Sequence, residues 1–118
     1  MEIEERSFLF AVRVVKLCQV LGEQRGVAKT LANQLLRSGT SIGANVAEAQ
    51  TAQSRKDFIH KLGISLKEAR ETQYWLRLLM ATDLIAVERL QPLLEESKVI
   101  IKILAKIIVS TKNNMNQA

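Results

Sequence analysis

Apolar residues recur at helical spacing through most of this chain. In the first segment they are separated by four, three and four residues: Phe10, Val14, Leu17 and Leu21. Phe8 and Val15 widen this stripe. Such spacing puts the side chains on one face of a helix, so it predicts an amphipathic helix over about residues 7–21. A charged run between two glycines predicts the turn that follows.

The second segment is interrupted by small and polar residues. Residues 38–45 contain two glycines and four side chains that compete for backbone hydrogen bonds, which favours a loop. The apolar spacing nevertheless continues in steps of four, three, four and three: Leu35, Gly39, Ile42, Val46 and Ala49. We therefore predict one helix over 27–50 with a closely packed small-residue middle. A break within 38–45 is the alternative.

A third helix is predicted from a capping signal and a long regular pattern. Ser54 is followed three residues later by Asp57, which resembles a capping box with Asp in place of Glu. From Ile59 to Met80 positions that are apolar except for Gln73 alternate by three and four residues. This pattern is typical of a bundle helix and predicts one over 55–81.

The fourth helix is the most apolar and is predicted over 86–111. Pro92 would kink a helix that began near residue 86, or would fit the first turn of one that began near Gln91. Residues 112–118 are polar, and we predict a frayed tail. Four helices with short connections in a chain of this length predict an all-α, up-down-up-down four-helix bundle, with residues 1–118 as a single domain.

The fourth helix carries more apolar surface than one bundle core needs. Nine of the eleven residues from Val99 to Val109 are apolar, whereas covering one core takes about three in seven. A second buried side is implied, so the sequence predicts a homo-oligomer.

Composition excludes several classes of protein. The 118 residues are 47% hydrophobic, with five glycines and one proline, which is a globular composition. The longest stretch without a charge is only ten residues, Ser38–Ala47, so no membrane span is expected. The first residues are acidic rather than basic and apolar, so we expect no signal peptide and a cytoplasmic protein.

The chain offers little catalytic chemistry. Its one cysteine, Cys18, and its one histidine, His60, cannot build an internal disulfide or a zinc site within one chain. No nucleophile and base can be paired by spacing, so we expect no enzyme, no cofactor and no metal. Asn45 and Glu48 can share a helix face, and they predict a buried structural hydrogen-bond network more than a catalytic one.

The distribution of charge is more informative. Seventeen Lys and Arg against twelve Asp and Glu give a net charge of +5, which permits nucleic-acid binding. At helical spacing, six side chains of the third helix fall within an arc of about 100°: Lys56, His60, Lys67, Arg70, Tyr74 and Arg77. A second basic row follows on the fourth helix: Lys98, Lys102 and Lys106. These rows predict contacts with phosphates, with Tyr74 stacking on a base. The alternative is a solvated face balanced by the flanking Asp57, Glu68 and Glu71.

Two blocks of the sequence point to a known family. The run Leu36–Asn45, continued by Glu48, resembles the signature of the four helix bundle proteins encoded within intervening sequences of bacterial 23S rRNA genes. A second block, Asp57–Leu76, resembles the family's third helix in order and spacing. The signature residues that we expect to be structural are Ser41, Gly43, Asn45 and Glu48. The chain departs from the common pattern at Gly43 and Ala49, which places it in a variant branch.

The resemblance implies a four-helix subunit, assembly into a homopentameric ring and no established enzymatic activity. Similar proteins are accessory subunits of diversity-generating retroelements, where a basic pentamer engages a reverse transcriptase and nucleic acid. Two hypotheses follow. One is a basic oligomeric RNA-binding accessory protein, and the other is an oligomeric scaffold that binds a protein partner such as a reverse transcriptase.

Overall fold

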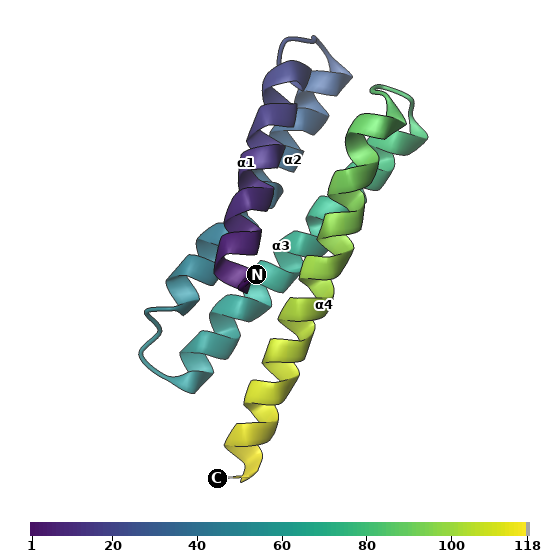
Figure 1. Cartoon of the computed structure of the whole chain (residues 1–118). Helices are drawn as coiled ribbons and strands as arrows, with labels where there is room; N and C mark the ends of the chain where they lie inside the picture. Colours follow the sequence, from purple (N-terminus) through teal and green to yellow (C-terminus); the bar gives the residue numbers. More distant parts are fainter. Residues whose placement is uncertain (118) are drawn as a thin grey trace.

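The computed structural model describes residues 1–117 and the side-chain environments of residues 1–116. Within residues 1–117, all regular structure is helical. Four helices follow one another in sequence: α1 (Ile3–Leu21), α2 (Val27–Ala49), α3 (Arg55–Ala81) and α4 (Val87–Gln117). They run up and down as an elongated bundle of 53 × 22 × 21 Å (Figure 1). No helix in the described part of the chain is long and apolar enough to cross a bilayer.

The helices pack in chain order, α1 on α2, α2 on α3 and α3 on α4, and the contact between α1 and α4 is smaller. Figure 1 shows why, because α1 is short and begins near the middle of α4. Arg6 Nε of α1 lies 2.6 Å from Glu96 Oε2, which fixes the level at which α1 starts. Beyond that level α4 continues without α1 beside it.

The observed bounds correct two predicted ends. The first helix begins at Ile3 rather than residue 7, because Ile3 packs against the core cluster. The predicted frayed tail is wrong for residues 112–117, which continue α4. Lys112 and Met115 share a hollow with Lys56 and Ile59 of α3, so the third helix supports these last turns. Residue 118 lies outside the described residues.

The predicted capping of α3 is confirmed. Ser54 has an extended backbone, and its Oγ accepts a hydrogen bond from the Asp57 backbone N–H at 3.0 Å. Pro92 falls inside α4, five residues after its start, rather than in a first turn. It lacks the N–H that would bond the Glu88 carbonyl, and Glu88 is exposed, so water can satisfy that oxygen.

The middle of α2 is continuous helix, as the apolar spacing predicted. A Cβ added at Gly39 would lie 2.8 Å from Val14 Cγ1, and one at Gly43 would lie 3.2 Å from the Ser7 carbonyl oxygen. The small residues therefore let the backbones of α1 and α2 approach closely. This confirms that they serve packing.

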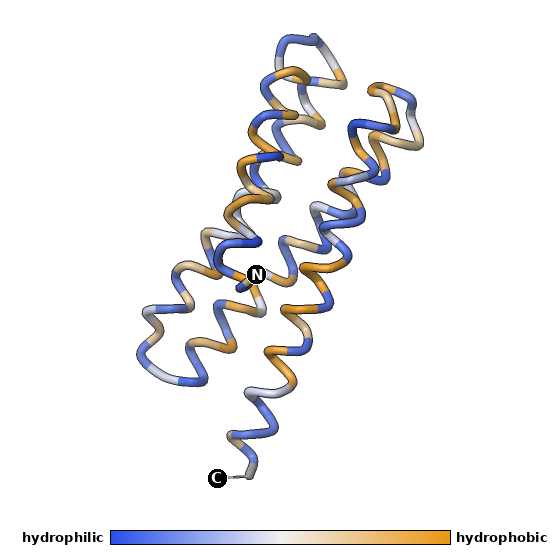
Figure 2. Tube along the Cα trace, in the orientation of Figure 1, coloured by the Kyte–Doolittle hydropathy of each residue, from blue (hydrophilic) through white to orange (hydrophobic). Residues whose placement is uncertain are grey.

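Hydrophobic and hydrophilic positions alternate along the helices (Figure 2), and most of the buried residues are apolar. Two predictions for α1 were wrong: Phe8 is 65% exposed and Val15 38% exposed, because they lie beside the stripe that faces α2. Helical spacing did not predict the buried hydroxyls between α2 and α3. Thr72 Oγ1 lies 2.9 Å from Ser38 Oγ and 2.8 Å from the Glu68 carbonyl oxygen, so these polar groups are satisfied.

Candidate nucleic-acid interface

The six side chains that form the basic stripe of α3 are all exposed: Lys56, His60, Lys67, Arg70, Tyr74 and Arg77. The opposite face of the helix is buried, from Leu62 to Leu79, which turns the stripe toward solvent. Gly63 lies in the stripe, and a Cβ there would meet no atom within 4 Å. The outer surface of α3 is therefore open for a ligand to approach.

The second basic row joins this stripe. Because α3 and α4 are antiparallel neighbours, Arg70 and Gln73 of α3 line one hollow together with Lys98, Ile101 and Lys102 of α4. Lys106 is exposed one turn farther along α4. The two rows predicted separately thus form one surface, which we call the α3/α4 basic face: Lys56, His60, Lys67, Arg70, Tyr74, Arg77, Lys98, Lys102 and Lys106.

The carboxylates that were expected to balance the positive charge of the stripe bond to other groups. Arg37 of α2 pairs with Glu68 at 3.1 Å between Nη1 and Oε2, and it also pairs with Glu71. Glu71 Oε2 further accepts a hydrogen bond from Trp75 Nε1 at 3.0 Å. Asp57 takes part in capping α3. None of these three carboxylates forms a salt bridge with a cation of the stripe within the described residues.

Most cations of the α3/α4 basic face have no acidic partner. Of this face, Lys98 alone has a salt bridge among the described side chains, 3.3 Å from Glu95 on an exposed turn of α4. The absence of ion pairs at Lys67, Arg70 and Lys102 leaves full positive charges side by side. Neighbouring like charges repel one another and attract a polyanion.

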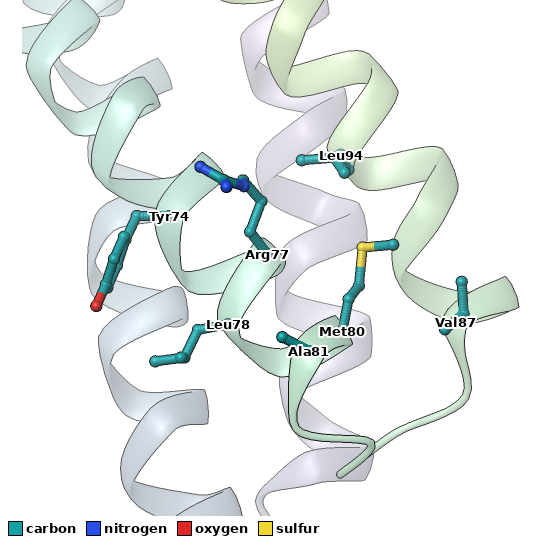
Figure 3. Close-up of a pocket in the computed structure, with 7 residues that line it drawn as sticks. All are labelled: Tyr74, Arg77, Leu78, Met80, Ala81, Val87 and Leu94. Atoms are coloured by element: carbon teal, nitrogen blue, oxygen red, sulfur yellow. The ribbon is translucent and has the colours of Figure 1, made fainter.

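The aromatic residue of the stripe has a fixed neighbour. Tyr74 is 54% exposed, and its ring meets that of Trp75 in a T-shaped contact with centroids 5.1 Å apart. Tyr74 and Arg77 also line a hollow that extends to the start of α4 (Figure 3). The face thus combines cations with one accessible ring.

Three signature residues of α2 make side-chain contacts within the chain. Ser41 Oγ donates to the Arg37 carbonyl oxygen at 2.6 Å, and Asn45 Nδ2 donates to the Ser41 carbonyl oxygen at 2.8 Å. The predicted network joining Asn45 to Glu48 is wrong, because Glu48 is exposed and pairs with Lys61 of α3 at 3.3 Å. These contacts tie the chain to itself, and Gly43 allows α1 to approach.

Other chemistry is sparse. Cys18 is buried as predicted, and burial raises the pKa of its thiol to about 11, which keeps it protonated near neutral pH. His60 is exposed on α3. Among the residues that the structure describes, no group of three or more His, Cys, Asp or Glu side chains is placed to hold a metal ion.

Comparison with known proteins identifies the relatives of this chain. The family model described as 23S rRNA-intervening sequence protein matches residues 1–106. A crystal structure from Bacteroides thetaiotaomicron, described as a protein with unknown function from the S23 ribosomal protein family, is 48% identical in sequence. The match covers 91% of this chain and 98% of that one, with a TM-score of 0.84. No curated protein sequence matches.

Proposed function

The chain belongs to the 23S rRNA-intervening sequence protein family, and from this premise we propose that it is a non-enzymatic, homo-oligomeric protein that binds RNA through phosphates. The observation that carries the proposal is the α3/α4 basic face, on which Arg70, Lys98 and Lys102 share one hollow. The family's link to rRNA genes makes RNA the polyanion we propose.

The binding we propose depends on charge more than on base sequence. Lysine and arginine side chains that contact phosphates release counterions, which supplies affinity without reading sequence. The face carries one exposed aromatic ring, Tyr74, and its other ligand-facing groups are cations and amides such as Gln73. We therefore expect RNA binding with weak sequence preference.

Assembly into a ring, with five copies as the leading size, belongs to the proposal. From Glu96 toward its C-terminal end, α4 has no part of α1 beside it. Ile103 and Ile107 in this part of α4 are only partly buried. Val99, on the same side of α4, remains 37% exposed. Apolar surface of this kind favours burial against another copy. A ring would repeat the basic face and strengthen weak phosphate contacts by avidity.

The proposal is tested by the salt dependence of binding. Purified protein is titrated into fluorescently labelled structured RNA at several salt concentrations. With four phosphate contacts per subunit, at about −0.9 each, the slope of log affinity against log salt should be about −3.6. A wild-type protein that retains no RNA even at low salt would contradict the proposal.

Assembly has its own test on α4. Ile103→Asp should dissociate the oligomer, because a carboxylate buried without a partner is costly. Light scattering should then report the 13.2 kDa subunit mass, against about five times that mass for wild type. Val109→Asp is the control, because Val109 lies on the lysine side of α4 and should leave assembly unchanged. A wild-type protein that is monomeric at micromolar concentration would contradict assembly, and circular dichroism shows whether each variant is folded.

The second candidate function is an oligomeric scaffold for a protein partner such as a reverse transcriptase. The observation that favours it is the apolar hollow at the α3–α4 turn, lined by Leu78, Met80 and the 41% exposed Val87. Protein interfaces enrich aromatic and apolar side chains at their centres. Failure to bind RNA at low salt would make this function the better account.

A further inference from the structure

A hollow lies at the end of the α3/α4 basic face, next to the turn between these helices. Seven residues line it: Tyr74, Arg77, Leu78, Met80, Ala81, Val87 and Leu94. Figure 3 shows Tyr74 and Leu78 pointing to one side of α3, Met80 on the other side toward Leu94 of α4, and Arg77 between these two groups. The lining is apolar apart from the Tyr74 hydroxyl and the Arg77 guanidinium.

The hollow continues the row of cations. Arg70 precedes Tyr74 by one helical turn and Arg77 follows it by nearly one turn, so the three side chains span about 10 Å of α3. Arg77 has no salt bridge within the described residues, and none of the residues that line the hollow is acidic. A chain whose phosphates contact Arg70 would next meet Arg77 along α3, at the hollow.

Neighbouring side chains restrain the ring of Tyr74. Trp75 is anchored by its hydrogen bond to Glu71, and Glu71 is itself paired with Arg37 of α2. The T-shaped contact with Trp75, at an interplanar angle of 75°, then limits the positions open to the Tyr74 ring. A ring that is 54% exposed yet restrained loses little conformational entropy when another ring stacks on it.

We propose that this hollow receives an unpaired nucleobase of the bound RNA, stacked on Tyr74 with its phosphate held by Arg77. The inference rests on the proposed RNA binding. It narrows the RNA that the protein binds to molecules in which a paired region adjoins single-stranded nucleotides. Apolar walls, one accessible ring and an unpaired cation suit a planar base carried on an anionic backbone. An apolar peptide segment would use the walls but leave the cations without partners.

The test compares two RNA hairpins of equal total length. One ends in a short unpaired tail that carries 2-aminopurine, and in the other the same nucleotides are paired. Wild-type protein should bind the tailed hairpin about tenfold more tightly, since stacking one base on an aromatic side chain adds affinity of this order. Stacking should also quench the 2-aminopurine fluorescence.

Substitutions at Tyr74 make the test specific. Tyr74→Ala should remove the tenfold preference and the quenching, whereas Tyr74→Phe keeps the ring and should retain both. Equal wild-type affinity for the two hairpins, with a normal salt slope, would overturn this inference and leave the proposed function standing. The inference also fails if Tyr74→Ala leaves the preference intact, as it would if the hollow served a protein. Binding of neither hairpin would overturn the proposed function as well.

Discussion

The double variant Lys67→Glu/Arg70→Glu should bind structured RNA about 10–100-fold more weakly than wild type. Both side chains are exposed at the centre of the α3/α4 basic face, and neither has a salt bridge in the described structure. Each reversal removes one phosphate contact and puts a negative charge beside the RNA. The slope of log affinity against log salt should fall in magnitude by about two, one for each lost contact.

The matched control reverses the charge of two lysines that lie outside the α3/α4 basic face. Lys16 of α1 and Lys29 of α2 are exposed, and Lys16→Glu/Lys29→Glu changes the net charge by the same amount. Because α1 packs on α2 and α4 but not on α3, Lys16 lies at the opposite corner of the bundle. If both double variants lost affinity equally, net charge rather than the α3/α4 basic face would account for binding.

Gly39→Leu should destabilise the fold by about 1–3 kcal/mol. Even a Cβ at this position would approach Val14 Cγ1 to 2.8 Å, and Val14 is fully buried, so neither helix can yield without disturbing the core. The free energy of unfolding, measured by urea denaturation followed by circular dichroism, gives the effect.

Gly63→Leu is the control for this substitution, because it makes the same change on a helix where a Cβ would meet nothing within 4 Å. Leucine is the better helix former, so Gly63→Leu should leave stability unchanged or raise it by about 0.5–1 kcal/mol. Equal losses of stability at the two glycines would show that Gly39 is not a packing contact between α1 and α2.

The fold could be predicted largely from apolar spacing, and the exceptions have physical causes. The pattern across residues 38–45 predicted a helix where local propensity favoured a loop, because close packing on α1 outweighs the weak preferences of small residues. Helical spacing did not predict that Thr72 is buried, since its hydrogen-bond partner Ser38 is 34 residues away in sequence. The C-terminal turns looked frayed because α3, which supports them, is distant in the chain.

The candidate site could be predicted only in parts. Helical spacing within α3 was enough to gather Lys67, Arg70 and Tyr74 on one face. Whether this face of α3 adjoins Lys98 and Lys102 of α4 depends on the register between two antiparallel helices, which the sequence does not specify. The pairing of Glu68 with Arg37, 31 residues apart, likewise could not be predicted from one helix, and it shows that Glu68 bonds to α2 rather than to a cation of the stripe.

Lysine footprinting of the RNA complex tests the central claim most directly. The protein is acetylated with and without structured RNA at low salt, and the modification of each lysine is measured by mass spectrometry. RNA on the α3/α4 basic face should protect Lys67, Lys102 and Lys106 and leave Lys16 and Lys29 as reactive as in the free protein. Unchanged reactivity at Lys67, Lys102 and Lys106, or protection confined to Lys16 and Lys29, would contradict the account.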